Sequence, residues 1–153
     1  MTTQTSSLAT AGAPVKENPT GTTTLHIHAN FSAQTLSDIA LLAKLPQGAV
    51  VTHLTGMFGT SNVDSVIKLG WKAPNSSTDN ETAFGTHTSS TTDAVTLIDM
   101  DVEEIVPVLI TFTDSIGQAF AQVYATCSVG SFTDTWSLDL VLQYTMDHNE
   151  RVN

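Results

Sequence analysis

A proline–glycine corner between two apolar segments constrains the fold of this chain more than any other sequence feature. Residues 38–45 are mostly apolar and lead into Pro46-Gln47-Gly48, and β-branched residues follow from Val50. Proline presets φ for a tight turn, and glycine can adopt the left-handed conformation that such a turn often needs. The corner therefore predicts two strands that it brings into a pair. Because much of the later chain alternates in the same way, we expect an all-β domain.

Alternation of apolar and polar residues with a period of two predicts the other strands. The expected strands are residues 22–31, 39–45, 49–58, 63–71, 95–100, 105–113, 119–129 and 136–146. The last two are the clearest, because one carries a face of small residues and the other a face of large residues, and such faces interdigitate across a core. About eight strands separated by turn signals indicate an antiparallel β-sandwich that is jelly-roll-like.

The first twenty residues differ in composition from the rest of the chain. They are rich in Thr, Ser and Ala, include two prolines, and cannot form a core of their own. A disordered tail is one interpretation. We expect residues 1–20 to be an extended N-terminal arm that lies against a neighbouring subunit, followed by a β-sandwich domain over residues 21–153. The interface candidates are Pro14, Val15, Pro19 and Pro107, the last because a proline places its strand at an edge or a bulge.

A polar stretch, residues 73–93, interrupts the strand pattern and is rich in Ser, Thr and Asn. Connections of this length are uncommon in compact domains and are either functional or mobile. We therefore expect a long loop here.

The charge balance argues against nucleic-acid binding, and the distribution of apolar residues argues against a membrane span. The chain has 15 acidic and five basic residues, a net charge of −10. Direct binding of DNA or RNA needs clustered Lys and Arg, so we expect no nucleic-acid partner, whereas a basic protein partner remains compatible. No apolar run approaches the length that spans a membrane, and residues 1–13 lack the features of a signal peptide.

Two histidines are weak candidates for a metal site. His26 and His28 share one face of their expected strand, and this spacing can bind zinc if a third ligand such as His53 or His87 joins them. The alternative is a pair of solvated histidines on an outer face. Nothing in the sequence places the third ligand, so we expect no bound cofactor.

Acidic and nucleophilic residues give no catalytic motif. The carboxylates Asp99, Asp101 and Glu103 alternate along one segment, but the glycine that bends a calcium loop is missing, and an acidic strand edge is the expected structure. The single cysteine, Cys127, is in phase with a small apolar face, where a packed, inert thiol is expected. We expect no enzyme activity.

Trp71 and Trp136 could serve as stacking platforms for a sugar. Both are in phase with the apolar residues of their strands, which favours packing in the core.

Two segments resemble small structural proteins of tailed bacteriophages. These segments are Asp38-Ile39-Ala40-Leu41-Leu42-Ala43-Lys44-Leu45-Pro46-Gln47-Gly48-Ala49-Val50-Val51-Thr52 and Val66-Ile67-Lys68-Leu69-Gly70-Trp71. In those proteins a similar Lys-Leu-Pro-x-Gly-Ala corner follows one strand, and a later strand closes on a similar glycine. The resemblance covers roughly residues 36–72, with a looser match in the final strands, and residues 73–93 depart from it.

This resemblance implies a virion structural protein that decorates or cements the capsid exterior. It implies a β-sandwich, often trimeric, whose N-terminal arm anchors it to neighbouring subunits of the major capsid protein. The loop of residues 73–93 would then point away from the shell. The alternative is a carbohydrate- or receptor-binding β-sandwich of a head fibre or tail, with that loop forming the site.

Overall fold

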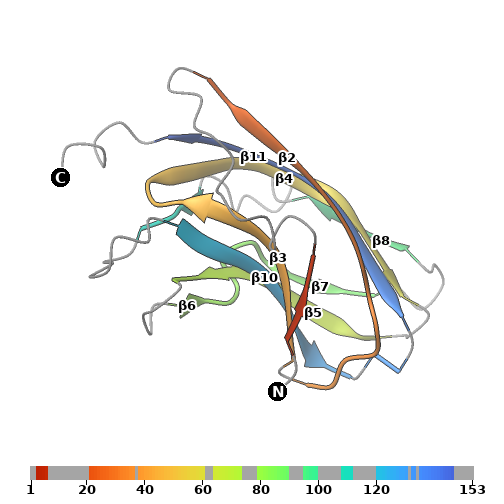
Figure 1. The fold of residues 1–153 in the computed structure, drawn as a ribbon. Coiled ribbons are helices and arrows are strands. Elements are labelled where there is room, and N and C mark those ends of the chain that lie inside the picture. Colours follow the sequence, from red (N-terminus) through yellow and green to blue (C-terminus); the bar gives the residue numbers. More distant parts are fainter. Residues whose placement is uncertain are drawn as a thin grey trace.

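Two β-sheets packed face to face form the computed structural model of this chain (Figure 1). The structure describes residues 3–6, 21–36, 38–60, 64–73, 79–89, 95–99, 108–111, 120–130, 132–133 and 135–146. These residues form eleven strands, and none of them belongs to a helix long and apolar enough to cross a membrane. The expected all-β sandwich is confirmed.

The first sheet has the strand order β1-β3-β10-β5-β6, with β7 also paired to β5. Its strands are β1 (Thr3–Thr5), β3 (Ile39–Pro46), β5 (Val66–Lys72), β6 (Asp79–Asn80), β7 (Thr86–Thr88) and β10 (Phe120–Val129). The second sheet has the order β2-β11-β4-β8, with β9 also paired to β4. Its strands are β2 (Thr23–Phe31), β4 (Ala49–Thr60), β8 (Val95–Asp99), β9 (Val108–Leu109) and β11 (Trp136–Met146). Only the pairing of β1 with β3 is parallel in the described chain.

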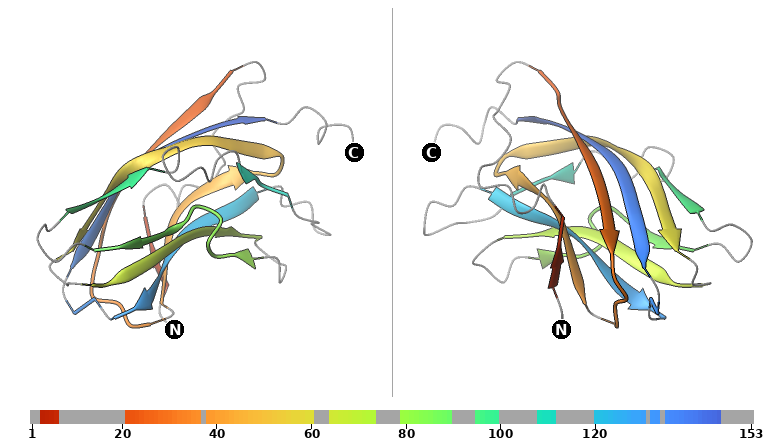
Figure 2. Two further views of the ribbon diagram at one scale, coloured as in Figure 1. Left: turned by 180° about the vertical axis from the view of Figure 1, so that it is seen from behind. Right: turned by 45° about the vertical axis from the view of Figure 1, so that its right-hand side comes forward.

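Successive long strands pass from one sheet to the other, as Figure 2 shows from two further sides. β2 and β4 belong to the second sheet, whereas β3 and β5 belong to the first, and β8, β10 and β11 continue the alternation. The resulting orders, β3-β10-β5-β7 and β2-β11-β4-β8, are those of a jelly roll. The short strands β1, β6 and β9 extend this framework.

The Pro46–Gly48 corner connects the two sheets, and the prediction that it pairs its flanking strands is wrong. β3 pairs with β10 and β1 in the first sheet, whereas β4 pairs with β11, β8 and β9 in the second, so the two strands lie in different layers. Gly48 has a φ of 80°, the left-handed conformation that was expected, and its N–H donates to the Ile110 carbonyl at 2.9 Å. The tight turn is therefore present as predicted, but it connects the first sheet to the second instead of joining two neighbouring strands of one sheet.

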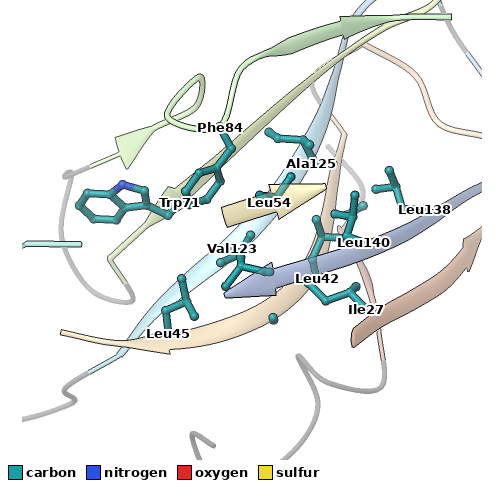
Figure 3. Close-up of a cluster of buried hydrophobic side chains, with 14 of the residues drawn as sticks. Ile27, Leu42, Leu45, Leu54, Trp71, Phe84, Val123, Ala125, Leu138 and Leu140 are labelled. Atoms are coloured by element: carbon teal, nitrogen blue, oxygen red, sulfur yellow. The ribbon is translucent and has the colours of Figure 1, made fainter. Parts of the chain in front are cut away.

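The core lies between the sheets, where apolar side chains of both point toward one another (Figure 3). Along β11 every second residue is buried, from Trp136 to Met146. β10 faces it from the other sheet with the small residues Ala121, Val123 and Ala125. This confirms the predicted match of a small face with a large one. Full burial of one such Leu side chain contributes roughly 1.5–3 kcal/mol.

The polar stretch is partly folded onto the first sheet. Within it, residues 79–89 include β6 and β7, which both pair with β5, and the Phe84 side chain is fully buried in the core. Residues 74–78 and 90–93 lie outside the described residues. The described part of the expected loop is therefore an edge of the first sheet. Strands of two and three residues are too short for an alternating pattern to reveal them.

Candidate functional site

The outer face of the first sheet carries a hollow that is built from three neighbouring strands and the segment after β5. Strands β3, β10 and β5 lie side by side, and their register sets the side chains in rows. Leu41, Tyr124 and Gly70 form one row, and Ile39, Thr126 and Lys68 form the next. Inward residues of the same strands fill the core, so these rows form the opposite surface of the sheet.

Gly70 allows the chain to fold back over this face. A Cβ at position 70 would lie 2.2 Å from the Asn80 carbonyl oxygen and 2.6 Å from the Glu81 Cα. Only a glycine leaves room for such an approach of two backbones. Residues 79–81, which we term the strap, therefore lie directly against β5.

Two polar contacts hold the strap to the sheet. The Tyr124 hydroxyl donates a hydrogen bond to a carboxylate oxygen of Asp79. The Lys68 ammonium lies 2.5 Å from Glu81 Oε1. Burial, and next the hydrogen bond to Asp79, raise the pKa of Tyr124 above its ordinary value, so this phenol stays protonated and remains a donor.

The strap and the sheet border a hollow of about 300 Å³ that is open to solvent. Lys68 and the strap carboxylates line one side, and Leu36 and Ile39 form an apolar wall on the other. Leu36 is 53% exposed, and Val129, which follows the lining residue Ser128, is 56% exposed. A polar hollow beside exposed apolar side chains suits contact with another molecule.

The sequence predicted neither the hollow nor its residues. Tyr124 is out of phase with the small face of its strand, and Gly70 interrupts an apolar run; these were the only local signals. The contacts that build the hollow join residues 13 and 45 positions apart, and strand order was needed to place them.

His26 and His28 lie exposed on the outer face of the second sheet, as their alternation predicted. His28 contacts the Asp139 carboxylate on β11. His87 is buried in the other sheet, where its Nε2 lies 3.1 Å from the Phe84 carbonyl oxygen, so it does not join them. Among the described residues, no group of three His, Cys, Asp or Glu side chains is placed to hold a metal ion. His26 and His28 stay weak, untested candidates for a metal site.

The remaining sequence candidates divide into buried and undescribed residues. Trp71 and Trp136 are buried, as predicted. The thiol of Cys127 is also buried and donates to the Gly130 carbonyl at 2.7 Å, and burial raises its pKa. The interface candidates Pro14, Val15, Pro19 and Pro107, and the carboxylates Asp101 and Glu103, lie outside the described residues.

Residues 3–6 tie the start of the chain to both sheets. β1 runs parallel to β3, and the Ser6 N–H donates to the Leu41 carbonyl at 2.8 Å. The Gln4 side chain bonds the backbone of Ser32 at the end of β2, accepting from its N–H at 2.9 Å and donating to its carbonyl at 3.3 Å. The start of the expected arm therefore belongs to the sandwich, and residues 7–20 lie outside the described residues.

Comparison with known proteins gives similarity in structure alone. No protein-family model matches the sequence, and no curated protein matches it. A chain in the capsid of Ralstonia phage GP4 is similar in fold, with a TM-score of 0.56, 14% identity, and coverage of 95% of this chain and 98% of that chain.

Two further capsid structures have lower scores. The cyanophage Pam1 capsid asymmetric unit contains a chain with a TM-score of 0.49 and 15% identity, covering 88% of this chain and 91% of that one. The acidic stable capsid structure of Helicobacter pylori bacteriophage KHP30 contains one with a TM-score of 0.43 and 15% identity, covering 81% and 92%. Of these three chains, the GP4 chain has a TM-score above 0.5, and at 14% identity its similarity indicates a shared fold alone.

Proposed function

We propose that this chain is a structural component of a phage virion that decorates or cements the exterior of the capsid. The observation that carries the proposal is the shared fold with a chain of the GP4 capsid over nearly the full length of both chains. A closed, apolar jelly-roll core suits this role, because a stable sandwich can be held on a shell by its surfaces and its arm.

The N-terminal arm is the proposed anchor to neighbouring subunits of the major capsid protein. Residues 3–6 are bonded to β3 and to the end of β2, which fixes the near end of the arm on its own sandwich. Residues 7–20, with Pro14, Val15 and Pro19, would make the contacts to the shell. A homotrimer is the proposed assembly, and its mass in solution can be measured by sedimentation equilibrium.

Co-sedimentation with bare capsids tests the role. We would compare the full chain with a variant in which residues 7–20 are replaced by a Gly/Ser linker of the same length, and with a chain that starts at Gly21. The linker variant keeps β1, so it separates loss of the anchor from loss of a strand. We expect only the full chain to pellet with shells. Circular dichroism is the control for folding, and we expect the variants to give the same spectrum as the full chain. Equal pelleting of the linker variant would contradict the anchor, and no pelleting of any form would contradict the capsid role.

A carbohydrate- or receptor-binding module is the second candidate. The supporting observation is the hollow, in which strap carboxylates lie beside hydroxyl groups of β10. Both tryptophans are buried, so neither offers a stacking platform for a sugar. Binding on a glycan array that is lost when residues 79–81 are replaced would favour this function.

A further inference from the structure

The positive charge that the structure places is confined to one face of the molecule. Lys44 on β3 and Lys68 and Lys72 on β5 all lie on the outer face of the first sheet, which we term the lysine face. The other two basic residues, Lys16 and Arg151, lie outside the described residues. In contrast, the described residues of β2, β11 and β4 on the outer face of the second sheet include no Lys or Arg. Two carboxylates of the strap, Asp79 and Glu81, lie on the same face, so lysines outnumber carboxylates there only slightly, but they do so on a chain with a net charge of −10.

The sheet holds two of these lysines at a defined separation. Lys44 and Lys72 flank Gln122 in the same row, one on each side. Two strand spacings place their backbones roughly 10 Å apart. The ammonium of Lys44 lies 5.0 Å from the ring centroid of Phe120, and that of Lys72 lies 5.7 Å from the ring centroid of Tyr124. These cation–π contacts position the two charges on the face.

The hollow extends the same face and points to a polypeptide partner. It begins beside Tyr124, its lining includes the exposed Leu36, and the exposed Val129 follows the lining residue Ser128. Three lysines are few for neutralising the phosphates of a nucleic acid. The strap carboxylates Asp79 and Glu81 lie beside Lys72 and Lys68 and disfavour either kind of anion at that edge. An acidic polypeptide can instead pair carboxylates with the lysines and insert an apolar side chain beside the hollow.

We propose that the lysine face docks onto an acidic polypeptide surface of the capsid shell, and that the outer face of the second sheet points away from it. This orientation turns the strap toward the shell, opposite to the direction that the resemblance implied for residues 73–93. The identity of the partner as shell protein rests on the proposed function; the acidic chemistry does not. Because the chain as a whole is acidic, an acidic shell attracts this face while repelling the rest, and this sets the orientation.

A pair of charge-matched variants tests the orientation on shells. The variant K44Q/K72Q removes two positive charges from the lysine face, and T24E/N30E adds two negative charges to exposed positions of β2 on the opposite face. Both lower the net charge by two. At low salt we expect K44Q/K72Q to bind bare shells about tenfold more weakly, and T24E/N30E to change binding by less than about twofold. Equal losses in both variants would overturn the proposal, since they would reflect net charge alone.

A peptide titration tests the recognition chemistry without shells. Amide shifts of the full-length protein would be followed on adding the peptide acetyl-Glu-Thr-Glu-Val-Glu-Thr-amide or its counterpart with Gln in place of Glu. We expect saturable shifts around Lys44, Gln122 and Lys72 with the Glu peptide only, and their loss in K44Q/K72Q. Equal shifts from both peptides, or none, would overturn the inference even if shells bind. Shifts without shell binding would support it and count against the capsid role.

A short DNA duplex serves as the competing ligand in the same titration. If it shifts the lysine-face amides at lower concentration than the Glu peptide, the face recognises phosphates and the polypeptide proposal is wrong. Thermal unfolding of both variants checks that they fold. If K44Q/K72Q unfolds, the substitute experiment is acetylation of Lys44 and Lys72 in the wild-type protein, measured with and without the Glu peptide. Slower acetylation in the presence of the peptide would support the proposal. An unchanged rate of acetylation would overturn the proposal.

Discussion

Tyr124 shows how one side chain couples a surface segment to the sheet beneath it. Its ring lies in the outer row of β10, and its hydroxyl donates to Asp79 on the strap. Replacing it with Phe keeps the ring and removes the hydrogen bond. Because the acceptor is a carboxylate, we expect Tyr124→Phe to lower the free energy of unfolding by about 1.5 kcal/mol at pH 7. Urea unfolding measures this difference.

The same residue predicts a pH dependence. Burial raises the pKa of Tyr124 in the folded state above the ordinary value near 10, so the folded protein keeps a proton that the unfolded chain loses. The stabilisation is therefore complete below pH 10 and is lost as the pH rises from there toward the raised pKa, by about 1.4 kcal/mol per pH unit. We expect the stability advantage over Tyr124→Phe to shrink between pH 10 and 11. An advantage that stays constant over this range would contradict the assignment.

At the scale of elements, Gly70 decides whether the strap can lie on β5. The atoms nearest to an added Cβ belong to the backbone of Asn80 and Glu81, so no side-chain rotation can relieve the overlap. We expect Gly70→Ala to cost about 2–3 kcal/mol and to speed hydrogen exchange in residues 79–85. The control is Thr86→Ala at an exposed position of β7. Wild-type stability and exchange in Gly70→Ala would show that the strap does not rest on this glycine.

Long elements could be predicted from the sequence, because periodicity measures burial. β11 alternates without interruption and was predicted with its bounds, and the apolar run of β3 was correctly taken as a strand. Short elements could not be predicted: β1, β6 and β7 span two or three residues and exist only because a longer strand offers them hydrogen bonds. The Pro46–Gly48 corner was recognised as a turn, but a turn does not state whether it joins neighbours or layers.

The lysine face and the hollow could not be predicted from the sequence either, because both depend on which strands are neighbours. Lys44 and Lys72 are 28 positions apart, and only the order β3-β10-β5 reveals that they flank one residue of β10. The hollow likewise depends on which strands are neighbours. The histidines differ, since the spacing of His26 and His28 placed both on one face correctly, as either solvated residues or weak metal candidates, and left only a third ligand open.

For the whole molecule, the two sheets share one continuous core. Each sheet buries its inward face only against the other, so neither can stay folded alone. A single apolar cluster of this kind unfolds in one cooperative transition. The jelly-roll connections strengthen the coupling, because β3 and β4 join the layers through a turn of two residues.

The two tryptophans allow this cooperativity to be measured, because each sheet contains one of them. Trp71 is buried on β5 of the first sheet, and Trp136 is buried on β11 of the second, where its ring stacks on Phe132 at 4.9 Å between centroids. The variant W136F reports the first sheet by fluorescence, and W71F reports the second. In each variant we expect the fluorescence transition in urea to coincide with the transition in far-ultraviolet circular dichroism, since loss of either sheet exposes the core of the other. If the fluorescence transition of one variant preceded its dichroism transition, the sheet that holds the remaining tryptophan would unfold first. The two sheets would then be separate cooperative units.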